Sequence, residues 1–367
     1  MSDPSRPFVI DSDAHVIEPP GLWKDYLKAR FRVRAPRPIV DERGGFCYDV
    51  DGTRIMRTAA ALGPSPEARK TVRLRPGGWD PKARLRDMDT EGVDLAVLYP
   101  SLAFFFPELP DPELHAALCR AYNDWLADHC RHAPERLIGI ALLPLDDVAA
   151  SIQELERATS RLGFRGAFFR PNPYAGRVIQ DPAYDPFWDC ARSLGVPITV
   201  HEGISDSLPT LGRERTPNPA FQHLMSHPFE QMAACAGLIL GGVLERFPDL
   251  SFVFLESGCG WLPYWLERMD GHWKTWGWHL PEIKRPPSEL FKRQCFVSMD
   301  TDDAGARFTL ESVGDENLVW ASDYPHLDAT FPGAVEETLE ILREVPDASR
   351  RKVLGGNARR LYGLTLP

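Results

Sequence analysis

The stretch VIDSDAHVIEP, Val9–Pro19, begins with an apolar run that is typical of a buried β-strand. Four ionisable side chains interrupt it, and burying such groups without partners is costly. Asp13 and His15 are two positions apart, so on a strand both side chains point to the same face. The stretch therefore predicts a buried strand that ends in ionisable side chains. Other groups in the fold must offset the cost of burying them. The four side chains are Asp11, Asp13, His15 and Glu18.

Short apolar segments recur along the chain, separated by longer segments with the period of amphipathic helices. Such alternation is typical of a parallel sheet, and eight strands close a (β/α)₈ barrel. We therefore predict an α/β fold of the TIM-like (β/α)₈ barrel type, with a doubly wound open sheet as the alternative. The triplet GCG at Gly258–Gly260 is too weak to indicate a dinucleotide site. The predicted strands are residues 8–16, 94–100, 137–145, 164–171, 197–203, 250–258, 294–300 and 318–326.

Three connections are longer than a barrel needs. They follow the first, fifth and sixth predicted strands and cover residues 23–79, 202–229 and 261–287. Long connections after barrel strands commonly shape the substrate pocket. We predict a single domain over residues 1–367, with residues 23–79 as a cap inserted in it.

The composition excludes several classes of partner. The chain has 367 residues, of which 43% are hydrophobic and 26% charged, and a formal net charge of −10, so it lacks the basic surface that nucleic acids require. Its seven cysteines contain no CxxC pair, which fits a reducing compartment. The longest apolar stretch, Met232–Leu244, is too short to span a bilayer, and the first residues lack the apolar core of a signal peptide. We expect a cytoplasmic enzyme with a small-molecule substrate and no membrane partner.

Polar side chains stand at the ends of several predicted strands, where barrel enzymes carry their catalytic groups. Asp13 and His15 end the first strand, His201 the fifth and Asp323 the eighth. Two imidazoles and two carboxylates suit Zn²⁺, Mn²⁺ or Fe²⁺ better than Ca²⁺, which prefers oxygen ligands alone. A metal would compensate the buried charge of the opening stretch.

Several longer motifs together resemble the amidohydrolase superfamily, in the branch around aminocarboxymuconate semialdehyde decarboxylase. The resemblance covers nearly the whole chain and is weakest in residues 23–79. It implies a distorted (β/α)₈ barrel with one divalent metal ion per chain, held by Asp13, His15, His201 and Asp323. Zinc is the first expectation, with manganese, magnesium or iron as alternatives, and a homodimer or homotetramer is implied as well. The motifs are DSDAHVIEP, VPITVHEG, HPFEQMAACAGLILGGVLERFPDLSFVFLESGCGWLPYWLERMD, VWASDYPH and VLGGNARRLYGL.

Two departures from the family pattern bear on the reaction. The first motif reads Asp-x-His, where the family often has His-x-His or Glu-x-His. Glu256 stands after the sixth strand, where decarboxylases of the branch often place a proton-handling histidine. A metal-activated water needs a carboxylate to take its proton, and Glu256 or Asp323 suits that role. We therefore expect a hydrolase acting on a small, carboxylated cyclic or aromatic compound.

Two other functions remain open. A nonoxidative decarboxylase would use the metal to hold its substrate and His326 or Glu256 to protonate carbon. His326 also suits a supporting role, in which it fixes a metal ligand by a hydrogen bond. A barrel that binds a ligand without turnover is a third possibility, but it has no reason to keep so many buried ionisable groups.

Other residues are candidates for substrate contact, each with a structural alternative. Arg170, at the end of the fourth strand, could grip a carboxylate. His223 and His227 have the i, i+4 spacing of a metal clamp, although surface or cap histidines explain them as well. Aromatic side chains after the second and sixth strands could line a pocket or only pack. The predicted substrate-binding residues are Arg170, His223, His227, Trp261 and Phe105.

Some chemically suggestive residues have simpler explanations. Asp11 and Glu18 are expected to stabilise turns or ion pairs. His129 and His132 are expected to be solvated near a helix C-terminus. Cys259 has no histidine near it in sequence, so we do not expect a nucleophile there.

Overall fold

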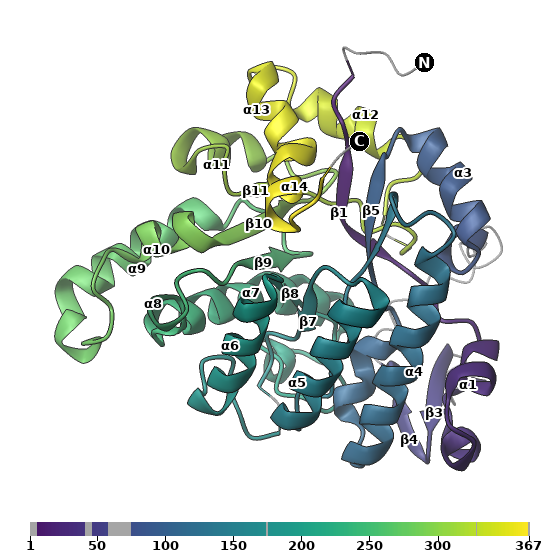
Figure 1. Ribbon diagram of the computed structural model, residues 1–367. Helices are drawn as coiled ribbons and strands as arrows, with labels where there is room; N and C mark the ends of the chain where they lie inside the picture. The colour runs from purple at the N-terminus through teal and green to yellow at the C-terminus, as the bar shows by residue number, and fades with distance from the viewer. Residues whose placement is uncertain (1–5, 41–45, 58–74, 174, 328, 366–367) are drawn as a thin grey trace.

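The computed structural model describes residues 6–40, 46–57, 75–173, 175–327 and 329–365. Eight parallel strands form its centre, and each lies inside one of the predicted segments (Figure 1). Nearly every side chain of these strands is buried, as expected for a parallel sheet that is covered on both faces. The strands are β1 Ile10–His15, β5 Leu95–Tyr99, β6 Leu137–Gly139, β7 Ala167–Phe169, β8 Ile198–His201, β9 Phe252–Leu255, β10 Cys295–Met299 and β11 Leu318–Trp320.

The eight strands close on one another. Regular pairing gives one sheet in the order β1-β5-β6 and another in the order β11-β10-β9-β8-β7. A parallel bridge between Ala141 and Ala167 joins β6 to β7. At the opposite seam the amide of Asp323 donates to the carbonyl of Asp13 at 2.9 Å, which joins the end of β11 to β1. The chain is thus a (β/α)₈ barrel, and the predicted fold class is confirmed.

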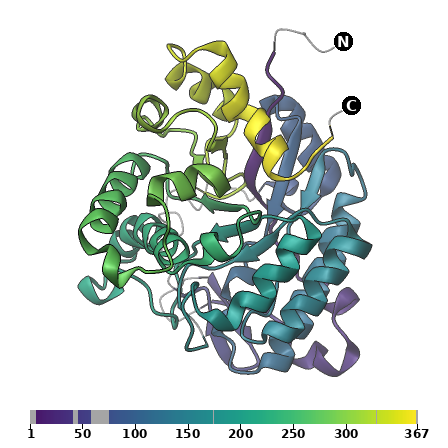
Figure 2. The same ribbon diagram turned by 60° about the vertical axis from the view of Figure 1, so that its left-hand side comes forward.

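Helices surround the strands in Figures 1 and 2. Several begin with the Asp-Pro pair seen in the sequence: the carboxylate of Asp111 accepts from the amides of Glu113 and Leu114, while Pro112 starts the first turn. The helices are α3 Pro81–Glu91, α4 Pro112–Cys130, α5 Val148–Arg157, α6 Asp185–Leu194, α7 Pro219–Leu240, α8 Val243–Arg246, α9 Leu262–Trp276, α10 Pro287–Gln294, α11 Ala306–Val313, α12 Ala334–Ile341, α13 Asp347–Arg351 and α14 Asn357–Leu361.

The connection after β1 carries its own small structure. It contains α1 Gly21–Tyr26 and a three-stranded antiparallel sheet of β2 Arg37–Val40, β3 Phe46–Val50 and β4 Thr53–Ile55. The hydroxyl of Tyr26 donates to Asp128 at 2.7 Å, which attaches α1 to α4. Residues 41–45 and 58–74 of the predicted cap lie outside the described residues.

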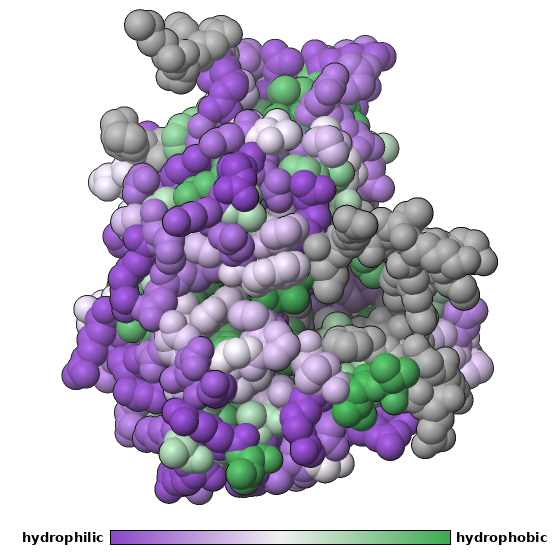
Figure 3. Space-filling model, turned by 90° about the vertical axis from the view of Figure 1, so that its right-hand side faces the viewer, coloured by the Kyte–Doolittle hydropathy of each residue, from purple (hydrophilic) through white to green (hydrophobic). Residues whose placement is uncertain are grey.

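The surface is mixed in character. On the face shown in Figure 3, hydrophilic residues predominate and hydrophobic ones lie in scattered groups. Within the described ranges, no helix has both the length and the apolar composition needed to cross a membrane. Trp276, the last residue of α9, and Trp278 are exposed, and neither lines a pocket in the described part of the chain.

Candidate metal centre

Four predicted ligands meet at the C-terminal end of the barrel. The Oδ2 atom of Asp13 lies 3.1 Å from Nε2 of His201, and Oδ1 of Asp13 lies 3.3 Å from Nε2 of His15. Oδ1 of Asp323 lies 3.1 Å from the same His15 nitrogen. The donor atoms of Asp13, His15 and His201 therefore lie within 4.8 Å of one another, and those of His15, Asp323 and His326 form an adjoining group that shares His15.

His15 and His201 both present their Nε2 atom to Asp13. Nδ1 of His15 donates to the carbonyl of Pro100 at 2.7 Å, and Nδ1 of His201 donates to the carbonyl of Glu202 at 2.6 Å. A carbonyl can only accept, so the proton of the neutral ring is assigned to Nδ1 in each case. The Nε2 lone pairs then face Asp13, as metal-binding imidazoles require.

The donor atoms fit a divalent cation. Both oxygens of Asp13 and Nε2 of both histidines are buried and, apart from their contacts with one another and with Asp323 and Glu256, have no hydrogen-bond partner among the described residues, which is costly for polar atoms. Ligands that bind a tetrahedral zinc at about 2.0–2.1 Å lie roughly 3.3 Å from one another. The observed separations of 3.1–3.3 Å match that spacing.

The cluster also competes for protons. Burial opposes charge on His15, yet hydrogen bonds and Coulomb attraction from Asp13 and Asp323 raise its pKa well above its ordinary value. Burial likewise works against ionisation of Asp13, but His201 and His15 lower the pKa of this carboxyl. A cation that binds here must displace the proton from His15, so its affinity falls in acid.

Two carboxylates at the rim have strained backbones. Glu256 has φ of 49° and Asp323 has φ of 57°, both in the left-handed region that costs non-glycine residues about 1–3 kcal/mol. Oε2 of Glu256 lies 3.5 Å from Nε2 of His201. Burial, together with the nearby Asp323 charge, raises the pKa of Glu256 to about 7. Strain of this kind is typical of functional positions.

The loop after β10 holds the turn that carries Glu256. Asp300 accepts from the amide of Gly258 at 2.8 Å, and Asp303 accepts from the amide of Cys259 at 2.6 Å. Gly305 packs so closely on the same turn that an added Cβ would lie 3.1 Å from the backbone of Gly260. The sequence analysis did not select these two acids. Asp300 ends the seventh predicted strand, and barrel enzymes carry their catalytic groups at strand ends, so that signal would have identified it.

His326 supports Asp323. Its Nδ1 lies 2.8 Å from Oδ1 of Asp323, and its ring stacks on His15 with 4.0 Å between centroids. Because a carboxylate can only accept, the ring proton is assigned to Nδ1, and Nε2 lies 2.8 Å from the hydroxyl of Ser101, which is also 2.8 Å from the carbonyl of Val16. Ser101 was not predicted, although it directly follows the second strand.

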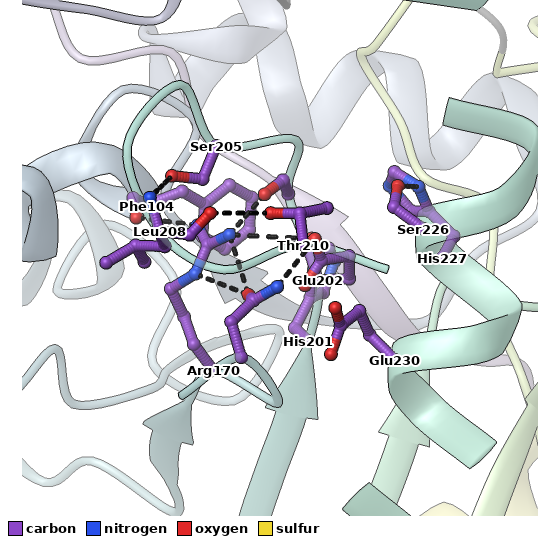
Figure 4. Close-up of polar contacts among 12 residues, drawn as sticks. Phe104, Arg170, His201, Glu202, Ser205, Leu208, Thr210, Ser226, His227 and Glu230 are labelled. Atoms are coloured by element: carbon purple, nitrogen blue, oxygen red, sulfur yellow. Dashed lines mark hydrogen bonds and ion pairs between the residues drawn. The ribbon is translucent and has the colours of Figure 1, made fainter. Parts of the chain in front are cut away.

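The geometry gives Arg170 a different role from the predicted one. Its guanidinium is 1% exposed and donates to Asn172, to the carbonyl of Phe104 at 2.9 Å and to the carbonyl of Gly203 (Figure 4). Glu202 lies 3.7 Å away as the charge partner. Since protein acceptors engage all three nitrogens, the side chain ties together the loops after β5 and β8 instead of reaching a substrate carboxylate.

The other predicted substrate contacts differ in position. His227 lies on α7 with Nε2 3.4 Å from Oε2 of Glu256, and the His223 ring lies 4.1 Å from the His227 ring. Nε1 of Trp261 donates to Ser257 beside the Glu256 turn. Phe105 is buried, but its neighbour Phe104 packs on the ligands, 4.6 Å from the His201 ring.

The residues for which no catalytic role was expected make structural contacts or lie at the surface. Glu18 accepts from the amides of residues 101–103, and Asp11 accepts from the amide of Ser322 at the β1–β11 seam. His129 is buried, contrary to the expectation that it is solvated, because it faces the interior side of α4. Burial and the nearby Arg84 lower its pKa to about 3. His132 is exposed as expected.

A cavity of about 860 Å³ lies outside the metal cluster. It is an open pocket bordered by the loops after β7 and β8 and by one face of α7, and the cluster's side chains do not line it. Pro171, Leu208, Thr210 and Glu230 are among its lining residues. The amide of Leu211 donates to Glu230 there at 2.6 Å.

The comparisons with known proteins agree on one family. The family model described as amidohydrolase matches residues 10–364. The chain is 28% identical over 289 residues to 2-amino-3-carboxymuconate-6-semialdehyde decarboxylase of Dictyostelium discoideum, covering 78% of this chain and 77% of that one. It is 28% identical over 311 residues to gamma-resorcylate decarboxylase of Rhizobium radiobacter, covering 77% and 86%.

Two further similarities span nearly the full length. A 2-keto-4-carboxy-3-hexenedioate hydratase of Sphingobium is 23% identical over 96% of both chains. The crystal structure of a dihydroxybenzoic acid decarboxylase from Polaromonas, with bound manganese and 2-nitroresorcinol, superposes with a TM-score of 0.73 at 20% identity over 98% of both chains. At that identity the structural likeness establishes the fold alone.

Proposed function

The chain belongs to the amidohydrolase family and is an enzyme of the hydrolase or carboxy-lyase kind, and from this premise we propose that it is a metal-dependent, nonoxidative decarboxylase of a small carboxylated, cyclic or aromatic compound. The grouping of Asp13, His15 and His201, with Asp323 3.1 Å from His15 and Glu256 3.5 Å from His201, carries the proposal. The names of the relatives favour decarboxylation over the hydrolysis that the sequence led us to expect.

The four converging side chains would hold the metal. Zinc fits the two imidazoles and two carboxylates, and manganese is proposed beside it because a decarboxylase of the same fold was crystallised with that ion. When bound, the cation supplies Lewis-acid stabilisation of negative charge on the substrate's oxygens.

The chain's own residues would orient the substrate and move a proton. In decarboxylation the bond between carbon and carboxylate breaks, CO₂ leaves, and the electron pair left on carbon takes up a proton. Glu256 stands at the cluster, with Oε2 3.5 Å from His201, and is the proposed donor. His326 is held between Asp323 and Ser101, so its proposed role is to orient Asp323. The acid recovers its proton from water after product release.

Buried apolar side chains would keep water from the reacting carboxylate. Phe104 lies against both imidazoles, with its ring 5.4 Å from His15 and 4.6 Å from His201. A carboxylate that sheds solvent loses the stabilisation of its charge, which favours departure of neutral CO₂. Phe105 and Trp261 are proposed to extend the apolar wall.

Hydration of a double bond is a second candidate, because the hydratase of Sphingobium matches 96% of this chain. A hydratase adds water and releases no CO₂, and a hydrolase incorporates the oxygen of water into a product.

A homodimer or homotetramer in the cytoplasm remains part of the proposal.

The test is a screen of carboxylated aromatic and unsaturated acids with metal-loaded enzyme in ¹⁸O-labelled water and, separately, in D₂O. We expect CO₂ release, deuterium on the carbon that lost it, and no ¹⁸O bonded to the remaining product. Glu256→Gln should lower kcat by roughly 10²–10⁴ with the first metal retained, whereas Asp302→Asn, an exposed control, should not. Incorporation of ¹⁸O into the product without CO₂ would overturn the proposal in favour of hydrolysis or hydration.

A further inference from the structure

A second group of ligand-type side chains lies beside the first. His223 and His227 on α7 and Glu256 after β9 each present one donor atom, and these three atoms lie within 4.8 Å of one another. Nε2 of His227 is 3.4 Å from Oε2 of Glu256. That separation resembles the distances among the four ligands of the first cluster.

The start of α7 sets the two histidines on one face. Asn218 caps the helix by accepting from the amides of Ala220 and Phe221, and Pro219 begins its first turn. Positions 223 and 227 are then one turn apart, and the two rings lie 4.1 Å from each other at 33°. This is the arrangement in which two histidines on a helix bind one metal ion.

The tautomer of His227 suits binding through Nε2. Its Nδ1 lies 3.2 Å from the carbonyl of His223 and 3.1 Å from the hydroxyl of Ser226, and because that hydroxyl donates to the same carbonyl, the ring proton is assigned to Nδ1. Nε2 then faces Glu256 with its lone pair. The side chain of His227 is 8% exposed, so this geometry is formed inside the fold.

Glu256 connects the two groups. Its Oε2 atom is 3.5 Å from His201 in the first cluster and 3.4 Å from His227 in the second. A carboxylate oxygen between two cation sites is the arrangement found in two-metal centres, whose ions lie about 3.5–4 Å apart. The strained backbone of Glu256 places it there.

We infer that His223, His227 and Glu256 form a second divalent-cation site that shares Glu256 with the first. Two imidazoles and one carboxylate are the ligand set of catalytic zinc sites that keep a position open for water or substrate. The centre would therefore hold two Zn²⁺ or Mn²⁺ ions per chain, where the family resemblance implies one. A Glu256 side chain that ligates this second ion is ionised, so it can donate the proposed proton only while the second site is empty. The inference itself concerns metal binding and does not depend on which reaction the enzyme catalyses.

The test is the metal stoichiometry of the full-length protein. Wild-type protein is stripped with chelator, titrated with Zn²⁺ or Mn²⁺ in a calorimeter, desalted and measured by elemental mass spectrometry. We expect two ions per chain in the wild type and one in His223→Gln and in His227→Gln. His272→Gln, which changes an exposed histidine of α9, is the matched control and should keep two.

Three other results would contradict the inference. One ion in the wild type, or two ions that persist in both α7 variants, would show that these histidines hold no second cation. Loss of all metal in His227→Gln, with an unchanged circular dichroism spectrum, would place His227 in the first site. Two ions in a wild-type protein that releases no CO₂ would leave this site intact while rejecting the proposed reaction.

Discussion

Oδ2 of Asp13 lies 3.1 Å from Nε2 of His201, a contact that joins the end of β1 to the end of β8 across the mouth of the barrel. Both atoms are buried, and outside this cluster neither has a hydrogen-bond partner among the described residues. The two side chains therefore form a pair whose geometry makes sense with a cation between them.

The first prediction is that removal of either His201 or Asp323 as a ligand abolishes metal binding at the first site. His201→Asn and Asp323→Asn should each lose the tightest-bound ion, because each removes a donor atom from the cluster. Elemental mass spectrometry of the purified variants is the measurement, and exposed His132→Asn is the control. Retention of that ion by both variants would sink the assignment of the four ligands.

A second prediction concerns stability. An ion that binds only the folded chain stabilises it by about 2.7 kcal/mol when its concentration is 100-fold above Kd. Thermal unfolding of chelator-treated protein should therefore occur at a lower temperature than that of protein with added Zn²⁺ or Mn²⁺. The shift should be smaller in His201→Asn, and an equal shift in both proteins would contradict a specific site.

The third prediction is that Arg170 is structural. Arg170→Met should lower the free energy of unfolding by about 3–5 kcal/mol, because it leaves Glu202 buried without its charge partner. Urea unfolding is the measurement. Arg192→Met, at a partly exposed ion pair with Asp189, should change stability by at most about 1 kcal/mol. The double variant Arg170→Met, Glu202→Gln should recover part of the loss.

The fourth prediction is that Asp303 positions Glu256. In Asp303→Asn one carboxylate oxygen is replaced by an amide donor, so the amide of Cys259 or of Gly305 loses its acceptor. Losing such a hydrogen bond costs about 1–3 kcal/mol locally, and we expect kcat to fall roughly tenfold while KM changes little. Asp302→Asn, on an exposed neighbour, is the control. Equal kcat values for the two variants would remove the positioning role.

The fifth prediction concerns acid stability. His129 has its pKa lowered from 6.5 to about 3 in the folded chain, so between these pH values the unfolded chain binds a proton that the folded chain does not. The free energy of unfolding must then fall as the pH falls through that window. His129→Leu should remove this term, which amounts to about 1.4 kcal/mol per pH unit at most.

Urea unfolding of His129→Leu and wild type at pH 8 and pH 5 measures the effect. The variant should gain stability relative to wild type at pH 5 and differ little at pH 8. His132→Leu is the exposed control. A stability difference between wild type and His129→Leu that does not change with pH would contradict the buried, neutral histidine.

The sequence alone determined the barrel and its strand ends. Apolar segments of strand length that alternate with helical ones specify a parallel sheet, and all eight predicted segments contain a barrel strand. Because side chains alternate along a strand and parallel strands end on one rim, Asp13, His15, His201 and Asp323 were expected together, and the structure brings them within 3.1–3.3 Å of their nearest neighbours.

Tertiary structure alone decided the contacts around these ends. Arg170 looks like a substrate contact in the sequence, but the loops after β5 and β8 surround its guanidinium with carbonyls. His129 looks solvated, but the side of α4 that carries it is covered. Asp303 lies in the loop after β10 and contacts the turn after β9, and Phe104 lies in the loop after β5 and packs on His201 of β8. Local patterns specify strands, helices and the face a residue occupies, whereas contacts between connections depend on how long, irregular loops pack against one another, and no periodicity records that.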